Sequence, residues 1–253
     1  MADLVPSLDR AFRDLDPLAR LRALRASVDG RIVLTTSFGL EDQYLTYLVF
    51  DNDLAIDVVT LDTGRLFPQT YTVWAETEAR YNRRIRPYYP DATALEELVA
   101  RQGIDGFYDS VEARKACCGL RKVEPLKRAL SGASAWVTGL RADASQARAD
   151  AVFVARDETH AVLKANPLLD WSRDRVERAA HESGVPVNAL HAQGFPSIGC
   201  APCTRAVKPG EDERAGRWWW EQDGKKECGL HVTADGTIVP HAPSSDGERP
   251  WSV

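Results

Sequence analysis

Five cysteines are the residues of this 253-residue chain best suited to chemistry. Four of them form two close pairs, Cys117-Cys118 and Cys200-x-x-Cys203, and Cys228 stands alone. Four thiolates suit a zinc ion or an iron–sulfur cluster. Paired zinc ligands usually have about two to four residues between them, whereas adjacent cysteines reach different metals of a larger cluster more easily. The spacing therefore favours a [4Fe–4S] cluster over zinc.

The charges around the two pairs support this interpretation. A buried four-thiolate cluster is anionic and needs cations or N–H donors nearby. Basic residues flank both pairs, namely Arg114, Lys115, Arg121 and Lys122 near the first, and Arg205 and Lys208 near the second. The alternative is that the cysteines are ordinary buried side chains and the basic residues are solvated. Basic flanks on both pairs make this alternative the weaker one.

Cys228 lies in the segment Glu227-Cys-Gly-Leu-His231. A lone cysteine three residues before a histidine is by itself a weak indication of a nucleophile. However, Arg214 and Arg217 lie just upstream, and a cationic environment lowers the pKa of a thiol and favours the reactive thiolate. We therefore expect Cys228 to be the nucleophile.

Composition limits the classes of partner. The formal net charge is −5, from 32 basic and 37 acidic residues, which gives no reason to expect non-specific binding to nucleic acid or membranes. No apolar run approaches the roughly 20 residues of a membrane span. The start of the chain, MADLVPSLDRAFRDLD, is charged and lacks the apolar centre of a secretory signal. We expect a cytoplasmic protein whose cysteines are not a disulfide scaffold.

Alternating apolar strands and amphipathic helices must position these residues. Strands are predicted at 31–36, 55–61, 84–88 and 135–140, with a hairpin at 152–163. Helices are predicted at 7–28 with a break near Pro17, at 41–50, 68–81, 93–101 and 172–183, and at 111–130 with an interruption around 117–119. This order predicts an α/β fold, with a mostly parallel twisted sheet and helices on both faces. The turns at 37–39, 62–65 and 139–141 then lie at the carboxyl ends of strands, where such sheets bind ligands.

The domain prediction is one α/β domain over residues 1–231. The remainder, residues 232–253, is rich in Ser, Pro, Gly and Asp, and we expect a mobile tail there.

Several segments together resemble one enzyme family. They are SFGLED (37–42), LDTGRLFPQTY (61–71), CCGLRKVEPL (117–126), WVTGLRAD (136–143), GCAPCTRAVKPGEDERAGRWWW (199–220) and KECGLH (226–231). In these segments, which run in the family's order, the chain resembles the assimilatory adenylylsulfate reductases, relatives of the phosphoadenylylsulfate reductases. The two cysteine pairs are the feature of the cluster-bearing branch, which typically uses adenosine 5′-phosphosulfate.

The resemblance implies a fold similar to the ATP pyrophosphatases (adenine nucleotide alpha hydrolase-like), with the nucleotide at the strand ends. It implies a [4Fe–4S] cluster on the four paired cysteines, with Lys122 between the cluster and the substrate. The other implied substrate contacts are Arg148, Arg214, Arg217 and His231 for the phosphosulfate, and Ser37, Leu61 and Gly139 for the adenosine. Each has a structural alternative; Ser37, for example, could cap the helix at 41–50. Where relatives commonly read R-R-D-Q-S, this chain has Arg141-Ala-Asp-Ala-Ser145, so the hydrogen bonding near Arg148 is expected to differ.

The implied reaction reduces adenosine 5′-phosphosulfate to sulfite and AMP through a Cys228 S-sulfocysteine. With four cysteines on the cluster, no second thiol is left in the chain, so a thioredoxin-like dithiol partner is expected. Three alternatives stay open: a phosphoadenylylsulfate reductase or dual-specificity enzyme, an ATP-dependent sulfur-transfer enzyme acting on tRNA, and a non-enzymatic iron–sulfur redox sensor. The sequence also leaves a homo-oligomer open.

Overall fold

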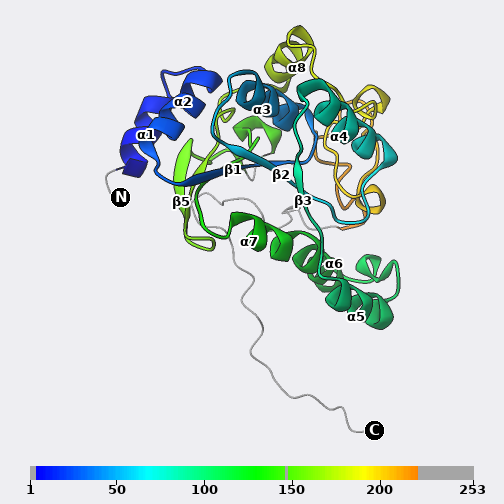
Figure 1. Ribbon diagram of the computed structural model, residues 1–253. Helices are drawn as coiled ribbons and strands as arrows, with labels where there is room; N and C mark the ends of the chain where they lie inside the picture. The colour runs from blue at the N-terminus through cyan, green and yellow to red at the C-terminus, as the bar shows by residue number, and fades with distance from the viewer. Residues whose placement is uncertain (1–3, 146–147, 222–253) are drawn as a thin grey trace.

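The computed structural model describes residues 4–145 and 148–221 and places them in an α/β fold (Figure 1). The expected tail at 232–253, together with Cys228 and His231, lies outside the described residues. The strands of the sheet are β1 (Arg31–Thr36), β2 (Asp57–Leu61), β3 (Arg86–Tyr88), β4 (Ala133–Val137), β5 (Val154–Asp157) and β6 (Val162–Ala165). Their order is β3-β2-β1-β4-β6-β5, and every pair is parallel except β5 with β6. The prediction of a mostly parallel sheet is confirmed.

Helices cover both faces of the sheet, as predicted. They are α1 (Leu4–Phe12), α2 (Pro17–Ser27), α3 (Leu40–Asp51), α4 (Pro68–Tyr81), α5 (Ala92–Gln102), α6 (Val111–Cys118), α7 (Glu124–Leu130) and α8 (Arg173–Glu182). Figure 1 shows α1 to α4 and α8 on one side of the sheet, and α5, α6 and α7 on the other. Because β1 is buried on both faces, its alternate residues enter different cores: Ile32 and Leu34 pack with the first group, and Val33 packs with Leu126 of α7.

Local capping explains several helix boundaries. The predicted break near Pro17 is the start of α2, where Asp16 Oδ1 accepts a hydrogen bond from Ala19 N at 2.9 Å. Ser172 caps α8 in the same way, accepting from Arg175 N at 3.3 Å. Ser37 does not cap α3, because Gly39 occupies that position and contributes no side-chain hydrogen bond. The capping alternative for Ser37 is therefore wrong.

The helix predicted at 111–130 with an interruption contains a π-helical turn instead. Helix α6 runs to Cys118, the π turn covers Gly119–Val123, and α7 follows without a break. The chain therefore stays helical where an interruption around 117–119 was predicted. A π turn widens the helix by one residue and is frequent at functional sites. Here it carries Arg121 and Lys122 immediately after the first cysteine pair.

Several predicted strand boundaries are shifted: the strands predicted at 55–61 and 84–88 begin two residues later, as β2 and β3. The strand predicted at 135–140 is β4, which ends at Val137 because Thr138 Oγ1 accepts from Leu140 N and turns the chain away from the sheet. The predicted hairpin is present as β5 and β6, and its second strand continues to Ala165. In the described part of the chain, no helix has the length and apolar character that a membrane span requires.

The strand order creates one switch point. From β1 the chain adds β2 and then β3 on one side, and it returns to add β4 on the other side of β1. The connections leaving β1 and β4 therefore diverge, and they open a crevice at the carboxyl ends of these two strands. This crevice is where the sequence places the turns at 37–39 and 139–141.

Candidate active site

A cavity occupies this crevice at the carboxyl ends of β1, β2 and β4. Seven of the residues predicted to bind substrate line it: Ser37, Leu61, Lys122, Gly139, Arg148, Arg214 and Arg217. They come from the strand ends, from the π turn, from the segment between β4 and β5, and from the segment after Cys203. The structure thus brings together every predicted substrate-binding residue that it describes. His231 and the predicted nucleophile Cys228 lie outside the described residues.

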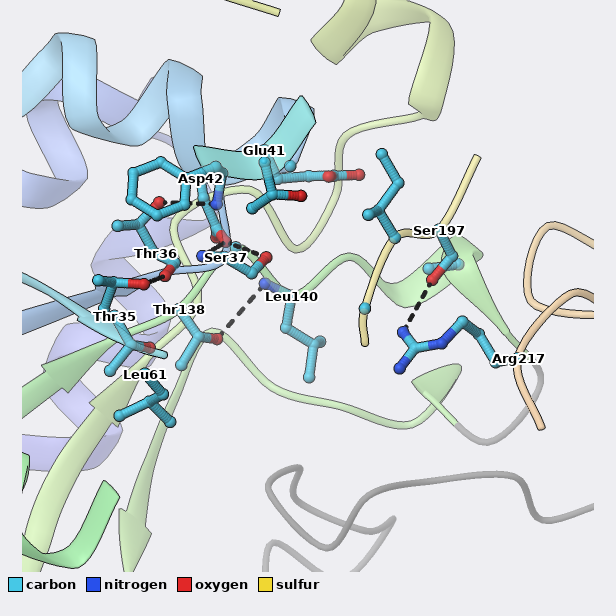
Figure 2. A pocket seen from close by; sticks show the side chains of 18 of the residues that line it. Thr35, Thr36, Ser37, Glu41, Asp42, Leu61, Thr138, Leu140, Ser197 and Arg217 are labelled. Carbon is cyan, nitrogen blue, oxygen red and sulfur yellow. Dashed lines mark hydrogen bonds between the residues drawn. The ribbon is translucent and has the colours of Figure 1, made fainter. Parts of the chain in front are cut away.

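The turn after β1 is fixed by a carboxylate. Asp42 Oδ2, in the first turn of α3, accepts hydrogen bonds from Ser37 N at 2.6 Å and from Ser37 Oγ at 2.7 Å (Figure 2). Phe38 lies between them in sequence and adopts a positive φ of 61°, which is costly for a large side chain. Its ring stacks on Trp74 with 5.5 Å between centroids. Packing and the Asp42 bonds together hold Ser37 at the cavity edge.

Gly139 allows the turn after β4 to approach α3. A Cβ at this position would lie 2.5 Å from Asp42 Oδ1 and 2.8 Å from Glu41 Cβ. No residue with a side chain fits there without moving α3. The glycine therefore lets the β1 and β4 turns form one continuous wall of the cavity.

Burial raises the pKa of Asp42 to about 6, and nearby Glu41 adds to that rise, while the two hydrogen bonds from Ser37 oppose it. Sequence reasoning did not single out Asp42 as a site residue, although it lies within the quoted SFGLED segment.

The opposite wall of the cavity carries Arg217 (Figure 2). Its guanidinium is buried; among the described residues Nη1 reaches Ser197 Oγ at 3.4 Å, and Nε has no hydrogen-bond partner. A Cβ on Gly199 would lie 2.2 Å from Arg217 Nη2, so this glycine leaves the space that the guanidinium fills. A buried guanidinium without a carboxylate partner in the described residues is suited to bind an anion.

The four paired cysteines meet around a second, smaller cavity. Its lining residues are Arg65, Phe107, Arg114, Cys117, Cys118, Arg121, Lys122, Cys200, Pro202 and Cys203. Two segments about 80 residues apart in sequence therefore supply four thiols to one space. The Trp218 side chain, which is 1% exposed, packs against the same cluster of residues.

The turn after β2 joins the two cysteine pairs. The Thr63 hydroxyl lies 3.2 Å from Cys200 Sγ, and the Thr63 carbonyl accepts from Arg121 Nη1 at 2.6 Å. Two residues after Thr63, the Arg65 carbonyl accepts a hydrogen bond from Ala201 N at 2.8 Å. This turn thus fixes the π turn and the Cys200 segment relative to each other.

Cys200 is the thiol whose environment favours the thiolate. Burial raises its pKa, but Lys122, the Thr63 hydroxyl and Arg217 together outweigh burial, so the pKa lies below the ordinary value. Lys122 and Arg217 also line the larger cavity, so the two cavities draw on the same positive charges.

Two other thiols are held protonated. Burial, followed by the neighbouring thiols of Cys200 and Cys118, raises the pKa of Cys203 to about 12. Burial also raises the pKa of Cys117, although Arg121 opposes it. Thiols crowded in this way need a strong positive charge to ionise together, and a coordinated metal supplies one.

The sequence identified the cations around the cysteines only in part. Arg114, Arg121 and Lys122 line the small cavity as expected. Lys115 and Lys208 are exposed, and Arg205 pairs with Glu211 at 2.7 Å, so these three do not line it. Arg65 lines it instead, and sequence reasoning missed that residue because it follows β2 and stands far from both cysteine pairs in sequence.

The small cavity is lined by four thiols and by several cations. Among residues 4–145 and 148–221, no three Cys, His, Asp or Glu side chains converge closely enough to hold a single metal ion. The thiols surround a space instead. Buried N–H groups without partners in the described residues, namely Arg121 Nε, Trp218 Nε1 and Trp220 Nε1, belong to residues that line this space or pack beside it. These groups could donate to the sulfur atoms of a bound cluster.

Lys122 is the one described residue that lines both cavities. Helix α6 delivers the first cysteine pair, and the π turn then directs Lys122 toward the crevice. The thiol cavity and the arginine-lined cavity are therefore neighbours that share a cationic wall.

Comparison with known proteins agrees with this architecture. The family model described as the phosphoadenosine phosphosulfate reductase domain matches residues 31–206. The chain belongs to this family. A protein of Sinorhizobium fredii (strain USDA 257) named adenosine 5′-phosphosulfate reductase is 52% identical over 240 residues, covering 94% of this chain and 95% of that one. A protein of the same name from Allochromatium vinosum is 54% identical over 214 residues, covering 85% and 82% of the two chains.

A solved structure of a family member has a similar fold. The phosphoadenylyl-sulfate reductase of Candida auris, determined as a phosphate complex, matches with a TM-score of 0.68 and 28% identity. The match covers 80% of this chain and 96% of that one. The family membership expected from the sequence motifs is confirmed.

The raised pKa of Asp42 predicts a pH dependence of stability. An acid with a higher pKa in the folded than in the unfolded state binds more protons when folded, so its contribution to the free energy of unfolding falls as pH rises. For Asp42 this fall spans from about the ordinary value of 3.8 to about 6. Asp42→Asn should remove it, because an asparagine oxygen still accepts from Ser37 without ionising.

Urea denaturation of both proteins between about pH 4 and pH 7 checks this prediction. The unfolding free energy of Asp42→Asn relative to the wild type should increase with pH up to about 6 and then level off. A difference that is constant over the whole range would contradict the raised pKa.

Proposed function

We propose that this chain reduces adenosine 5′-phosphosulfate to sulfite and AMP, with electrons from a thioredoxin-like dithiol. The observation that carries the proposal is the shared wall of the two cavities, where Lys122 lines both the four-thiol space and the arginine-lined crevice. The relatives that are about half identical over nearly the whole chain bear the name of this activity. A redox sensor would have no use for an anion-binding crevice beside its thiols.

In the proposed complex, the adenosine lies at the strand ends against Ser37, Leu61 and Gly139. The phosphosulfate then extends toward the cationic side chains of the crevice, namely Lys122, Arg148, Arg214 and Arg217. Guanidinium groups bind such oxyanions through paired, charge-assisted hydrogen bonds. The proposed polarity of the nucleotide follows from this separation of the strand ends from a basic wall.

The proposed chemistry takes place at Cys228. Its thiolate attacks the sulfur of the sulfate group, the bond from sulfur to the bridging oxygen breaks, and AMP leaves with that electron pair. The basic wall stabilises the charge that develops on the phosphate. A thiolate of the dithiol partner then attacks Cys228 Sγ and expels sulfite, and the second partner thiol resolves the mixed disulfide. The dithiol is thereby oxidised and supplies both electrons.

The four paired cysteines would hold a [4Fe–4S] cluster as the resident cofactor. Bound there, the cluster would supply negative charge beside Lys122 and Arg121. These two side chains then compensate that charge while Lys122 also faces the substrate. Free thiols and a cluster both require reducing conditions, so we place the chain in the cytoplasm.

The alternative substrate carries an additional 3′-phosphate. The solved Candida auris relative is named for that nucleotide, so the family includes such enzymes. Turnover measured with both nucleotides at equal concentration separates a reductase for adenosine 5′-phosphosulfate from a dual-specificity enzyme.

Cys228→Ser should bind the nucleotide but release no sulfite, because no sulfur nucleophile is left outside the cluster. Mass spectrometry of wild-type protein incubated with adenosine 5′-phosphosulfate, without reductant, should show a single SO₃ adduct on the peptide that contains Cys228. Sulfite production by Cys228→Ser at the wild-type rate, or an adduct on another residue, would exclude this nucleophile.

The cofactor assignment predicts about four iron and four sulfide per chain in anaerobically purified protein, as for a [4Fe–4S] cluster. Cys203→Ser should lose most of this iron, whereas Cys228→Ser should retain it and serves as the matched control. Visible absorption read beside metal analysis checks both. Fully active protein without iron, or one zinc per chain, would contradict the assignment.

Gly199→Ala should weaken substrate binding with little loss of stability. The added Cβ meets the end of the flexible Arg217 side chain, which can swing away, so the fold tolerates it. Losing one charge-assisted contact is worth about 1.5–3 kcal/mol, so KM should rise by roughly ten-fold or more. Arg217→Gln is the reference: if Gly199→Ala acts through Arg217, the double variant should be no worse than Arg217→Gln. Unchanged KM in Arg217→Gln would show that Arg217 does not contact substrate.

A further inference from the structure

Arg141 lies at the centre of an ion-pair network at the edge of the crevice. Its side chain is fully buried, at 0% exposure, and it contacts three carboxylates. Nε donates to Glu41 Oε1 at 2.7 Å, Nη1 donates to Asp143, and Nη2 donates to both oxygens of Glu213 at 2.7 and 2.8 Å. The partners Glu41 and Glu213 are 100 and 72 residues away in sequence. One side chain thus joins three segments of the cavity wall.

The charges make Arg141 indispensable to this arrangement. A guanidinium stays protonated when buried, so its carboxylate partners are required as counterions. Conversely, the three carboxylates would repel one another without Arg141. Glu213 has one further described cation, Arg173 at 3.1 Å, whereas Arg141 is the cation that the structure records for Glu41 and Asp143 among the described residues. Removing Arg141 therefore separates these segments instead of leaving them in place.

Glu213 connects this network to the proposed anion-binding residues. It immediately precedes Arg214, whose backbone N donates to Asp212 Oδ1 at 2.8 Å and whose carbonyl accepts from Arg217 N at 2.9 Å. The segment from 212 to 217 is therefore a tight turn held by local hydrogen bonds. Its side-chain connection to the turn after β4 runs through Glu213 and Arg141.

We propose that Arg141 is a positioning residue that sets the place of Arg214 and Arg217 in the crevice by holding Glu213. This inference rests on the proposed function, because it assumes that these two arginines bind the phosphosulfate. Arg141 acts through other side chains and pairs with carboxylates, so it does not itself serve as the anion ligand.

A purely structural role would have a different signature. Arg20 offers the comparison, since it is also buried, at 1% exposure, and pairs with Asp170 at 2.6 Å and with the carbonyls of Phe12 and Pro167. Arg20 lies on α2 and lines neither cavity. Breaking a buried pair destabilises a protein wherever it lies. Only a positioning role couples the substitution to affinity for the substrate.

The test measures the dissociation constant of adenosine 5′-phosphosulfate by calorimetry in a Cys228→Ser background, which prevents turnover. Arg141→Met should weaken binding ten-fold or more, and Arg20→Met should leave binding within two-fold of the parent. In a background of Arg214→Gln and Arg217→Gln, adding Arg141→Met should change affinity by less than two-fold, because its route of action is already lost. Glu213→Ala, which keeps Arg141 paired with Glu41 and Asp143, should weaken binding in the same way and replaces Arg141→Met if that variant does not fold.

The proposal would be overturned if Arg141→Met or Glu213→Ala bound the nucleotide within two-fold of the parent. It would also be overturned if Arg141→Met weakened binding as much in the Arg214→Gln and Arg217→Gln background as it does in the parent. The proposed function fails separately, if the parent does not bind this nucleotide or if Arg214→Gln with Arg217→Gln leaves its affinity unchanged.

Discussion

The position of Lys122 between two cavities is the constraint on which the rest of the site depends. One cavity gathers four thiols, and the other is lined by arginines and strand ends. Both the proposed cluster and the proposed substrate are anionic, so each requires cations at the wall that separates them. The π turn supplies Lys122 and Arg121 to that wall directly after the first cysteine pair, and Thr63 fixes the turn to the second pair. Electrostatics therefore ties the proposed cofactor site to the proposed reaction site.

Close approach of backbone segments completes the crevice. Gly139 lets the turn after β4 pack on the start of α3, and Gly199 leaves room for the Arg217 guanidinium. Each of these contacts depends on the absence of a single Cβ. Any other residue at either position would therefore force neighbouring atoms to move. The parallel sheet determines where the crevice lies, and the two glycines together with the Arg141 network determine its shape.

Much of the architecture could be predicted from local patterns. Strand β1 and helix α4 were predicted at their observed bounds because apolar runs and helical periodicity are local signals. The cysteine pairs were visible from their spacing. The directions of side chains could not be predicted in this way. Lys115, Arg205 and Lys208 are near cysteines in sequence but do not line the thiol cavity, whereas Arg65 does line it. Contacts such as Arg141 with Glu213 join residues far apart in sequence, and no local pattern encodes them.

In the proposed enzyme, four sulfur atoms hold the cofactor and one is left for chemistry. Counting reactive thiols on the native protein by alkylation under anaerobic conditions, followed by peptide mass spectrometry, tests it most directly. The account predicts one alkylated cysteine, Cys228, in native iron-loaded protein, and five after denaturation and removal of iron. Rapid alkylation of any paired cysteine in the iron-loaded protein, or a protected Cys228, would contradict it.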